Sequence, residues 1–541
     1  MKLTDAGIKD KEQWEKAGYS MPKYDRAKVI ADTMSEPEWI HFGAGNIFRA
    51  FQANVVQNLL NKGILTKGLI VAEGYDYEII DKANKPYDNL SILVTLKASG
   101  NVDKIVVGSI VEALKADSLD ADFVRLKEIF HAPSLKMVSF TITEKGYSIV
   151  NSKGVVMEAV LKDFEAGPEC PQSYIGKVVA LLYDRFLNNE LPIAMVSMDN
   201  CSHNGDKLYH VVNVFAREWE SRGLVKKGFT EYVQNKEKVS FPWTMIDKIT
   251  PRPDEAIVEI LKKDGIEKIQ PVVTAKNTYV APFVNSEECQ YLVIEDSFPN
   301  GKISLEEGGI IYTNRETVDK VEKMKVCTCL NPLHTAMAIY GCLLGYTSIS
   351  TETKDPEIKK MIERIGYTEG LPVVVNPGII KPENFLKEVI ETRLPNPFLP
   401  DTPQRISTDT SQKLSIRYGE TVKAYMNNAD LDIRNLKMIP LVFAGWLRYL
   451  KGIDDKGNVF TPSSDPLLEE AASYVKGFTL GSKPKETEVH DIVKKLLSRK
   501  DIFGVNLYEA GLGEEVEKYF IEMLVGTDAV RNTLRKYTQR G

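Results

Sequence analysis

Cysteine is scarce in this chain of 541 residues, which contains six. They are Cys170, Cys201, Cys289, Cys327, Cys329 and Cys342, scattered except for the pair at 327 and 329. A long chain with scattered thiols lacks the pattern of a disulfide framework, so we interpret them as buried apolar side chains. A zinc site formed by Cys327, Cys329 and His334 is the alternative. It is disfavoured because helical positions i and i+2 point apart and no second pair of cysteines or histidines accompanies them.

Long apolar runs and a strong charge of one sign are also missing. No apolar run approaches the roughly 20 residues of a membrane helix, and charged sequence instead of a signal core follows the start at Met1. The 69 basic and 75 acidic residues give a net charge of −6, which argues against general nucleic-acid binding. We therefore predict a cytoplasmic protein that binds neither membranes nor nucleic acid. Its length predicts two domains.

The N-terminal region contains a strand, a glycine turn and a helix in succession. Residues Glu38–Phe42 predict a short buried strand, and a helical pattern runs from Phe48 to Leu60. Between them, Gly43 permits a tight turn and Gly45 lets the backbone approach a pyrophosphate at the helix N-terminus. The third glycine of the usual dinucleotide fingerprint is replaced by Phe48. The predicted cofactor contacts of this turn are Gly43, Ala44, Gly45, Asn46, Ile47, Phe48 and Arg49.

A second predicted strand, Gly68–Glu73, ends in a carboxylate 28 residues after Gly45. This spacing exceeds the roughly 20 residues of the standard pattern, but a helix and a turn fit between them. A carboxylate at this strand end accepts hydrogen bonds from a ribose diol and repels a 2′-phosphate, so Glu73 favours NAD over NADP. A solvated glutamate in a turn is the alternative interpretation.

Strand and helix patterns alternate from Trp39 to about Pro299, and helical patterns dominate after about Val318. Further predicted strands are Leu69–Ala72, Leu90–Leu96, Ile105–Ile110, Met137–Thr143, Ile193–Met198 and Tyr291–Ile294, with residues 89–108 as an antiparallel excursion. Predicted helices include Tyr174–Leu187, Lys207–Arg222, Leu333–Tyr346, Pro356–Ile365, Pro382–Arg393, Gln412–Asn427, Ile439–Lys451, Pro466–Phe478, Val489–Leu497 and Gly513–Val525. The predicted fold class is α/β: a Rossmann-like N-terminal domain with a mostly parallel sheet, followed by an all-helical C-terminal domain.

Residues 321–334 carry the clearest candidate chemistry, because they place Lys325, Asn331 and His334 close together beside an apolar helix. A lysine held away from water loses proton affinity and can act as a base near neutral pH. An amide and a neutral imidazole can hold an alcohol or ketone oxygen while its charge changes. A solvated lysine and a hydrogen-bonded structural histidine are the alternative.

Seven short sequence motifs, called islands below, occur in the same order as in one family and together resemble it. They are Gly43–Ala50, Thr143–Tyr147, Asp199–Gly205, Phe241–Pro251, Glu322–Lys325, Arg405–Lys413 and Trp446–Asp455. Over roughly residues 36–530 the chain resembles the polyol-specific long-chain dehydrogenases, the mannitol dehydrogenase family. The resemblance implies an NAD-dependent, metal-independent interconversion of a secondary alcohol and a ketone. It also implies an NAD-binding domain over residues 1–310, a helical substrate-binding and catalytic domain over residues 311–541, and a monomer or weak dimer.

The resemblance also implies roles for individual residues. Lys325 corresponds to the general acid–base, and Glu322 to an acid that helps move the proton to solvent. Asn200, Asn331 and His334 correspond to residues that polarise the substrate oxygen. The implied contacts to the sugar chain are Asp247, Arg405, Lys413 and His203, and Glu144 is the implied additional cofactor contact. A surface ion pair for Asp247, a turn cap for His203 and a solvated loop for Arg405 and Lys413 are the alternatives.

One departure from the family pattern concerns the lysine segment. Five residues separate Lys325 from Asn331, where the family usually has four, and an extra residue on a regular helix rotates the groups that follow by about 100°. Either the helix begins after the insertion, which Pro332 suits, or a one-residue π-bulge absorbs it. If neither holds, Lys323 is the substitute for Lys325.

Within the family, the resemblance favours reduction of a sugar acid, D-fructuronate to D-mannonate. Such a substrate needs a cation for its carboxylate, and Arg405 can bind one in bidentate fashion. The alternatives are interconversion of fructose and mannitol, reduction of tagaturonate, and, more remotely, a protein that senses NADH without chemistry. A hydrolase is poorly supported because the chain has no Gly-x-Ser-x-Gly elbow.

Overall fold

The computed structural model describes residues 1–539, and the chain divides into two compact units. The first unit comprises Met1–Lys97 and Asn101–Asp319, and the second comprises Lys320–Gly541 together with Ala98–Gly100. The division falls inside helix α11 (Arg315–Met324). Each unit has buried apolar residues enough for a core of its own.

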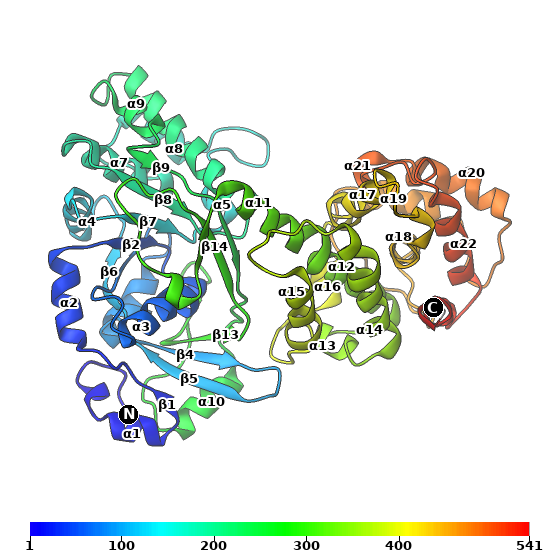
Figure 1. Cartoon of the computed structure of the whole chain (residues 1–541), viewed down its shortest axis with the longest axis horizontal. Coiled ribbons are helices and arrows are strands. Elements are labelled where there is room, and N and C mark those ends of the chain that lie inside the picture. Colours follow the sequence, from blue (N-terminus) through cyan, green and yellow to red (C-terminus); the bar gives the residue numbers. More distant parts are fainter. Residues whose placement is uncertain (540–541) are drawn as a thin grey trace. The chain divides into compact units, whose positions relative to one another are not determined.

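A six-stranded sheet forms the centre of the first unit, and all its neighbouring strands are parallel. Its order is β6 (Ile110–Lys115), β3 (Leu69–Glu73), β2 (Trp39–Phe42), β7 (Met137–Phe140), β8 (Ile193–Ser197) and β9 (Val239–Ser240) (Figure 1). The chain runs from β2 outward to one side, then returns to β7 on the other side. This reversal creates a switch point between β2 and β7, where doubly wound sheets bind their ligands.

Every residue of β2, β3, β7 and β8 is buried, as expected for a parallel sheet with helices on both faces. Helices α4, α7 and α8 pack in sequence against one another. The helices of the first unit are α1 (Lys11–Lys16), α2 (Arg26–Ser35), α3 (Ala53–Asn61), α4 (Asp122–His131), α5 (Thr143–Gly146), α6 (Glu158–Ala166), α7 (Tyr174–Leu187), α8 (Asn204–Ser221), α9 (Phe229–Gln234) and α10 (Glu255–Lys263). A π-helical turn, η2 (Phe48–Gln52), leads into α3.

A second sheet of the first unit contains the predicted antiparallel excursion, which is confirmed. Strands β4 (Ser91–Leu96) and β5 (Val102–Val107) pair antiparallel, while β1 (Tyr19–Ser20) and β13 (Phe283–Glu287) flank them in parallel. The prediction of one strand over Ile105–Ile110 was wrong, because β5 ends at Val107 and β6 begins at Ile110. Two hydrogen bonds to α3 hold the turn between β5 and β6. Gly108 N donates to Gln57 Oε1 (3.0 Å), and Ser109 Oγ donates to Ala53 O (2.6 Å).

Short strands complete the first unit. Strand β10 (Thr244–Asp247) pairs antiparallel with β14 (Tyr291–Glu295), which pairs in parallel with β15 (Ile311–Thr313). A small hairpin joins β11 (Val272–Val273) to β12 (Tyr279–Val280). The sequence did not predict β10 or β13, since residues such as Asn285, Ser286 and Glu287 interrupt the apolar pattern although all are buried.

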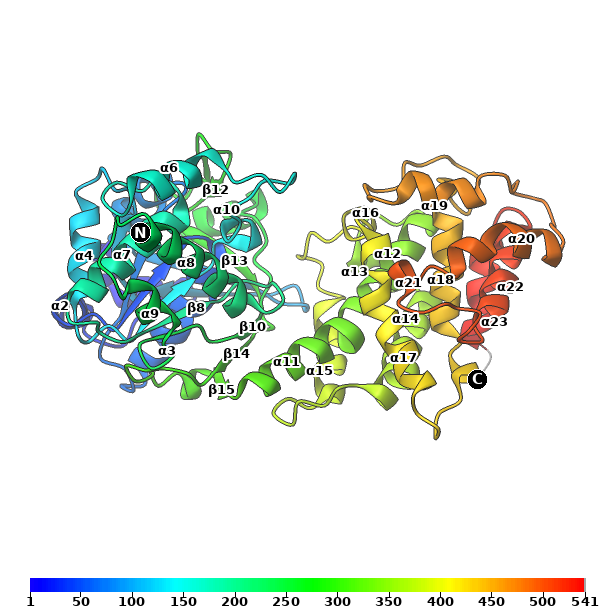
Figure 2. The same cartoon turned by 90° about the horizontal axis from the view of Figure 1, so that it is seen from above.

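Helices form every element of the second unit between residues 320 and 539 (Figure 2). Helix α18 (Met438–Tyr449) is buried along its whole length and packs against α12 (Asn331–Leu344) and α22 (Gly513–Leu524). The others are α13 (Ile349–Glu352), α14 (Pro356–Glu363), α15 (Pro382–Glu388), α16 (Pro403–Ile406), α17 (Glu420–Met426), α19 (Leu468–Val475), α20 (Glu486–Leu497), α21 (Lys500–Phe503) and α23 (Ala529–Gln539). Several π-helical turns adjoin them, including η6 (Lys325–Cys329), η7 (Arg364–Gly370), η9 (Val389–Arg393) and η11 (Ser415–Gly419).

One helical run, Arg315–Leu344, is long and apolar enough to cross a membrane by length and composition alone. However, 78% of its most apolar window is buried inside the protein. This burial is what the core helix of a folded domain has, and α12 occupies that place in the second unit.

Candidate active site

The glycine turn after β2 borders a cavity of about 570 Å³. Gly43 has a φ of +108°, and a Cβ there would lie 2.3 Å from the carbonyl oxygen of Thr141, so only glycine fits. A Cβ on Gly45 would meet nothing within 4 Å. The strand end is therefore closed around Gly43 and open above Gly45, the arrangement that a backbone approach to a phosphate requires.

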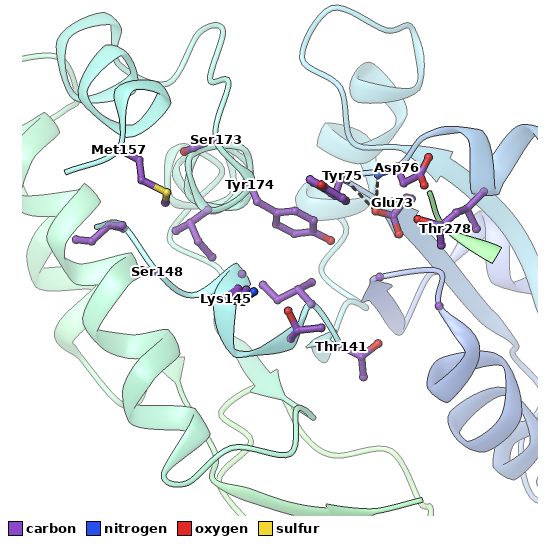
Figure 3. Close-up of a pocket in the computed structure, with 18 of the residues that line it drawn as sticks. Glu73, Tyr75, Asp76, Thr141, Lys145, Ser148, Met157, Ser173, Tyr174 and Thr278 are labelled. Carbon is purple, nitrogen blue, oxygen red and sulfur yellow. Dashed lines mark hydrogen bonds between the residues drawn. The ribbon is translucent and has the colours of Figure 1, made fainter. Parts of the chain in front are cut away.

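The cavity lies at the carboxyl ends of β2, β3 and β7, which is the switch point of the sheet. Glu73, Tyr75, Asp76 and Thr278 line one side, and the loop that follows β7 lines another (Figure 3). The ring of Tyr174, from α7, points into the space between these groups. A pocket of this size with apolar walls and a few polar groups is typical of a small-molecule or cofactor site.

Glu73 is buried, and three backbone amides occupy its carboxylate. Oε2 accepts from Ala44 N (2.9 Å), while Oε1 accepts from Tyr75 N (2.8 Å) and Asp76 N (3.1 Å). Burial raises the pKa of Glu73, and these hydrogen bonds oppose the shift. The carboxylate thus ties the glycine turn to the loop after β3. Its predicted contact with a ribose stays a prediction.

Asp76 is the second acid of this wall. Its Oδ2 accepts a hydrogen bond from Thr274 Oγ1 (2.6 Å), and the residue lines the cavity. An acid here repels a phosphate in the same way as the predicted Glu73. Asp76 therefore adds to the physical case for a cofactor without a 2′-phosphate.

The loop after β7 is held by Asp199, at the end of β8. Asp199 Oδ1 accepts from Thr143 N (2.8 Å), and Oδ2 accepts from Ile142 N (2.9 Å) and from the Tyr147 hydroxyl (2.5 Å). Thr143, Lys145 and Gly146 of this loop line the cavity. The predicted cofactor contact Glu144 is not among the residues that line the cavity, and its exposed carboxylate forms an ion pair with Lys207. Its contact with a cofactor stays untested.

Of the seven predicted contacts in the glycine turn, Gly43 and Gly45 line the cavity. Phe48 is buried and stacks on His41, with ring centroids 4.2 Å apart, so an aromatic pair takes the place of the third glycine. Arg49 is only 1% exposed, and burial lowers its pKa to about 10. Its Nε and Nη2 have no hydrogen-bond partner among the described residues. Asn46 and Ile47 are partly exposed at the start of the helix.

The end of β8 and strand β10 hold three predicted substrate-side residues. Asn200 is exposed, and Asp247 is buried at the end of β10. His203 adopts a φ of +50° and stacks on Trp243 with centroids 4.1 Å apart. Its Nε2 lies 3.3 Å from Asp319 Oδ1. These contacts hold the His203 ring at the turn before α8; its role toward a substrate stays a prediction.

A π-helical turn accommodates the fifth residue between Lys325 and Asn331. Between α11 and α12, Leu330 N donates to Lys325 O over five residues (3.1 Å). Leu330 then leaves the helical conformation, and α12 begins at Asn331 with Pro332 in its first turn. Both expected routes are therefore present. The wider turn takes up the additional residue that a regular helix would convert into a rotation.

Burial separates the two candidate lysines. Lys325 is 4% exposed, whereas Lys323 is exposed. Asn331 and His334 lie on the first turn of α12, three positions apart and thus on one face, and both are partly exposed. Glu322 is partly buried one turn before Lys325. Lys325 thus lies on the π-helical turn, and Asn331 and His334 lie on the helix that follows it. Their closeness to one another and their catalytic roles stay predictions.

His334 has a strongly altered proton affinity. Burial lowers its pKa to about 4; Arg393, Arg417 and Arg405 lower it further, and Asp401 opposes them. Near pH 7 the imidazole is therefore neutral and can donate one hydrogen bond. The neighbouring Cys329 thiol is buried, with its pKa raised to about 12. Among residues 1–539, no three His, Cys, Asp or Glu side chains gather in an arrangement suited to a metal ion.

Arg405 and Lys413, the predicted contacts to the sugar chain, differ in their surroundings. Arg405 is 64% exposed and forms an ion pair with Asp401. Lys413 Nζ donates to the carbonyl oxygens of Thr408 and Ile406. Burial lowers the pKa of Lys413, and Arg417 adds to this effect.

Comparison with known families covers most of the chain. The mannitol dehydrogenase Rossmann domain matches residues 37–307, and the mannitol dehydrogenase C-terminal domain matches residues 317–524. The chain belongs to the mannitol dehydrogenase family. The resemblance read from the seven islands is thereby confirmed. The fold class is confirmed as well: a Rossmann-type domain with a mostly parallel sheet, followed by a helical domain.

Individual members of the mannitol dehydrogenase family align along the whole chain. The D-mannonate oxidoreductase of Thermotoga maritima is 54% identical, and the alignment covers 100% of this chain and 99% of that protein. The mannitol 2-dehydrogenase of Emericella nidulans is 28% identical, with 96% of each chain covered. The solved Pseudomonas fluorescens mannitol 2-dehydrogenase, in a ternary complex with NAD and D-mannitol, has a TM-score of 0.68 at 24% identity, with 100% of both chains covered. That last likeness concerns the fold.

Several residues that shape the site were assigned no role from the sequence. Asp76 and Asp199 each follow a strand end, and a systematic search for acids at such ends would have found them. Arg417 had no such signal. It approaches His334 only through the folding of the second unit, from 83 residues further along the chain.

Proposed function

We propose that this protein is an NAD-dependent oxidoreductase that reversibly reduces a keto sugar acid, D-fructuronate, to D-mannonate. The observation that carries the proposal is the 54% identity, over the whole chain, to the D-mannonate oxidoreductase of Thermotoga maritima. The open space beside Gly45 and the burial of Lys325 support the proposal.

The cavity beside Gly43 and Gly45 fits a dinucleotide. Gly45 leaves room for a pyrophosphate beside the start of the helix, and Asp76 and Glu73 supply the acidic wall that suits a ribose diol. When bound, the nicotinamide supplies or accepts the hydride at the substrate carbon. The protein contributes orientation, a shielded site and the proton.

The proton is assigned to Lys325. In the reducing direction its ammonium gives a proton to the ketone oxygen, and in the oxidising direction its amine removes the proton of the hydroxyl group. Glu322, one turn away, is the proposed route for that proton to solvent. Asn200, Asn331 and the neutral His334 are the proposed donors that hold the oxygen while its charge changes, which stabilises the transition state without a further proton transfer.

The substrate panel that tests this function uses NADH absorbance with D-fructuronate, D-tagaturonate and D-fructose. We expect the highest kcat/KM for D-fructuronate, and oxidation of D-mannonate when NAD replaces NADH. NADPH should be the poorer reductant, since an acidic wall repels its phosphate. A clear preference for fructose would contradict the proposed substrate, and binding of NADH without turnover of any ketose would contradict the proposed enzyme.

Mannitol 2-dehydrogenase activity is the second candidate, favoured by the full-length similarity to the Emericella nidulans enzyme. The same panel separates it, because fructose would then be the preferred ketose. The functional division into residues 1–310 and 311–541, a monomeric or weakly dimeric state and a cytoplasmic location stay proposals. Light scattering of the purified protein measures the oligomeric state directly.

A further inference from the structure

Positive side chains gather around the first turn of α12. The group has four members: Arg393 at the end of η9, Arg405 in α16, Lys413 before η11 and Arg417 within η11. The three arginines influence His334 electrostatically, and Arg417 and Arg405 also influence Lys413. All of them belong to the second unit. Three short segments between residues 389 and 419 thus bring positive charge to the helix turn that carries Asn331 and His334.

Arg405 is the member of this group whose positive charge is already paired with an acidic side chain. Its guanidinium pairs with Asp401, and the side chain is largely exposed. An exposed, paired arginine gains little from a further carboxylate, because water and the existing partner screen it. The sequence-based choice of Arg405 as the carboxylate-binding group is therefore not the one that these contacts favour.

Arg417 has different surroundings. Its Nη1 donates to the hydroxyl of Thr335, the residue next to His334, and no acidic side chain of residues 1–539 forms an ion pair with it. Burial lowers the pKa of Arg417, and Tyr418 opposes that shift. A partly buried guanidinium with hydrogen-bonding capacity left over is the group that gains most from a carboxylate ligand.

Lys413 completes the pair. Arg417 N donates to Lys413 O (3.0 Å), so the two residues lie one helical turn apart. Asp409 and Asp465 favour the charged form of Lys413, but Asp465 is engaged by Ser411 N (2.7 Å) and by the Ser411 hydroxyl. Two neighbouring, partly buried cations repel each other, and an anion placed between them relieves that repulsion.

We propose that Arg417, assisted by Lys413, binds the carboxylate of the sugar acid and thereby distinguishes it from a neutral ketose. This inference rests on the proposed function. In D-fructuronate the carboxylate lies at the opposite end of the carbon chain from the keto group, and fructose carries a hydroxymethyl group in its place. With the keto oxygen held near Asn331 and His334, Arg417 and Lys413 contact the end of the substrate that carries the carboxylate or the hydroxymethyl group.

The test compares Arg417→Met and Arg417→Lys with the wild-type enzyme on D-fructuronate and D-fructose. Arg417→Met should lower kcat/KM for D-fructuronate at least about 30-fold, the lower end expected when one partner of a desolvated charge pair is truncated. Its kcat/KM for fructose should stay the same or rise. Arg417→Lys keeps the charge but not the bidentate geometry, so it should recover only part of the loss. The matched control is Arg434→Met, at an exposed arginine of the same unit paired with Asp432.

The outcomes separate the inference from the proposed function. A wild-type enzyme that prefers fructose would contradict the function itself. A wild-type enzyme that prefers D-fructuronate, together with an Arg417→Met variant that keeps this preference, would overturn the inference alone. A purely structural role for Arg417 would lower both activities together, which also counts against the inference. Should Arg417→Met fail to fold, the substrate preference of Arg417→Lys decides: an unchanged preference and unchanged kcat/KM refute it.

Discussion

At the scale of single residues, the neighbours of each site residue decide which of its atoms can still contact a ligand. Gly43 and Gly45 are both glycines of one turn, yet backbone surrounds the first and open space adjoins the second. Glu73 is an acid beside the cavity, yet backbone amides donate to both its oxygens. Residue type alone gave the chemistry available at this turn, whereas hydrogen-bond partners decide which atoms remain for a ligand.

The two glycines give the first prediction. Gly45→Val should leave the melting temperature nearly unchanged but raise the Kd for NADH by about tenfold or more, because atoms forced into a filled site cost about 1–3 kcal/mol. Gly43→Ala should instead destabilise the fold, since its Cβ would meet the Thr141 carbonyl at 2.3 Å and its φ is +108°. Thermal melting and fluorescence titration with NADH measure the two effects. Equal losses of stability in both variants would contradict this assignment.

The buried lysine gives the second prediction. Lys325→Ala should lower kcat by about 10²–10⁴-fold, the usual contribution of a general acid–base, while the Kd for NADH stays nearly the same. Lys323→Ala is the matched control, because that side chain is exposed two residues away. Steady-state kinetics and NADH titration provide the two numbers. Substantial residual turnover in Lys325→Ala, or an equal loss in Lys323→Ala, would refute the assignment.

Glu352, in α13 of the second unit, gives a prediction about pH. Its carboxyl group is fully buried, neither oxygen has a hydrogen-bond partner among the described residues, and burial raises its pKa to about 9, with Asp355 adding to the shift. The folded state therefore keeps a proton that the unfolded chain releases above pH about 4.5. The free energy of unfolding should fall as pH rises between these values, by at most about 1.4 kcal/mol per pH unit.

The isosteric variant Glu352→Gln isolates this effect. It cannot ionise, so the slope of its unfolding free energy against pH should be flatter than that of the wild type between pH 5.5 and 8.5, a window chosen inside the range from about 4.5 to about 9. Glu391→Gln, at an exposed acid, serves as the control. Calorimetric melting across this window gives the slopes, and parallel slopes for wild type and Glu352→Gln would rule the buried acid out as the source.

At the scale of elements, the strongly patterned segments were predictable and the polar ones were not. Helix Tyr174–Leu187 was predicted with its observed bounds, and the strand predicted over Glu38–Phe42 begins one residue later, because a helical period or a largely apolar run marks them. Strands β10 and β13 were missed, since buried polar residues such as Asp247, Asn285 and Glu287 interrupt their apolar patterns. The same distinction applies to helix ends: the predicted helix Pro382–Arg393 is an α-helix to Glu388 and a π-helical turn beyond it.

The π-helical turn at Lys325 is the element on which the site most depends. The sequence predicted two ways to take up the extra residue, and the structure combines them: a wider turn over Lys325–Cys329 and a fresh start at Asn331. A regular helix across the same residues would rotate the groups after the lysine by about 100°. The helical breaks of the lysine segment could thus be predicted, but the surroundings of Arg417 could not, because they arise where α16 and η11 pack against α12.

At the scale of the whole molecule, the candidate groups divide between the two units. The cavity beside the glycine turn is lined entirely by residues of the first unit, while His334, Lys413 and Arg417 belong to the second. Asn200, His203 and Asp247, which are also proposed to contact the substrate, belong to the first unit. The proposed cofactor contacts lie in the first unit alone, so the two ligands can be distinguished by the segments that each one protects.

Hydrogen exchange measured by mass spectrometry tests that division. NADH should slow amide exchange in residues 43–49, 73–76 and 141–149, since a ligand suppresses the local opening of the segments it contacts. D-Mannonate, added to the complex with NADH so that no turnover occurs, should slow exchange further in residues 330–335 and 413–417. Residues 486–497 of α20 line neither set and provide the internal reference. Protection by NADH confined to the second unit, or by D-mannonate confined to the cavity wall of the first, would assign the ligands the other way and remove Arg417 from the substrate site.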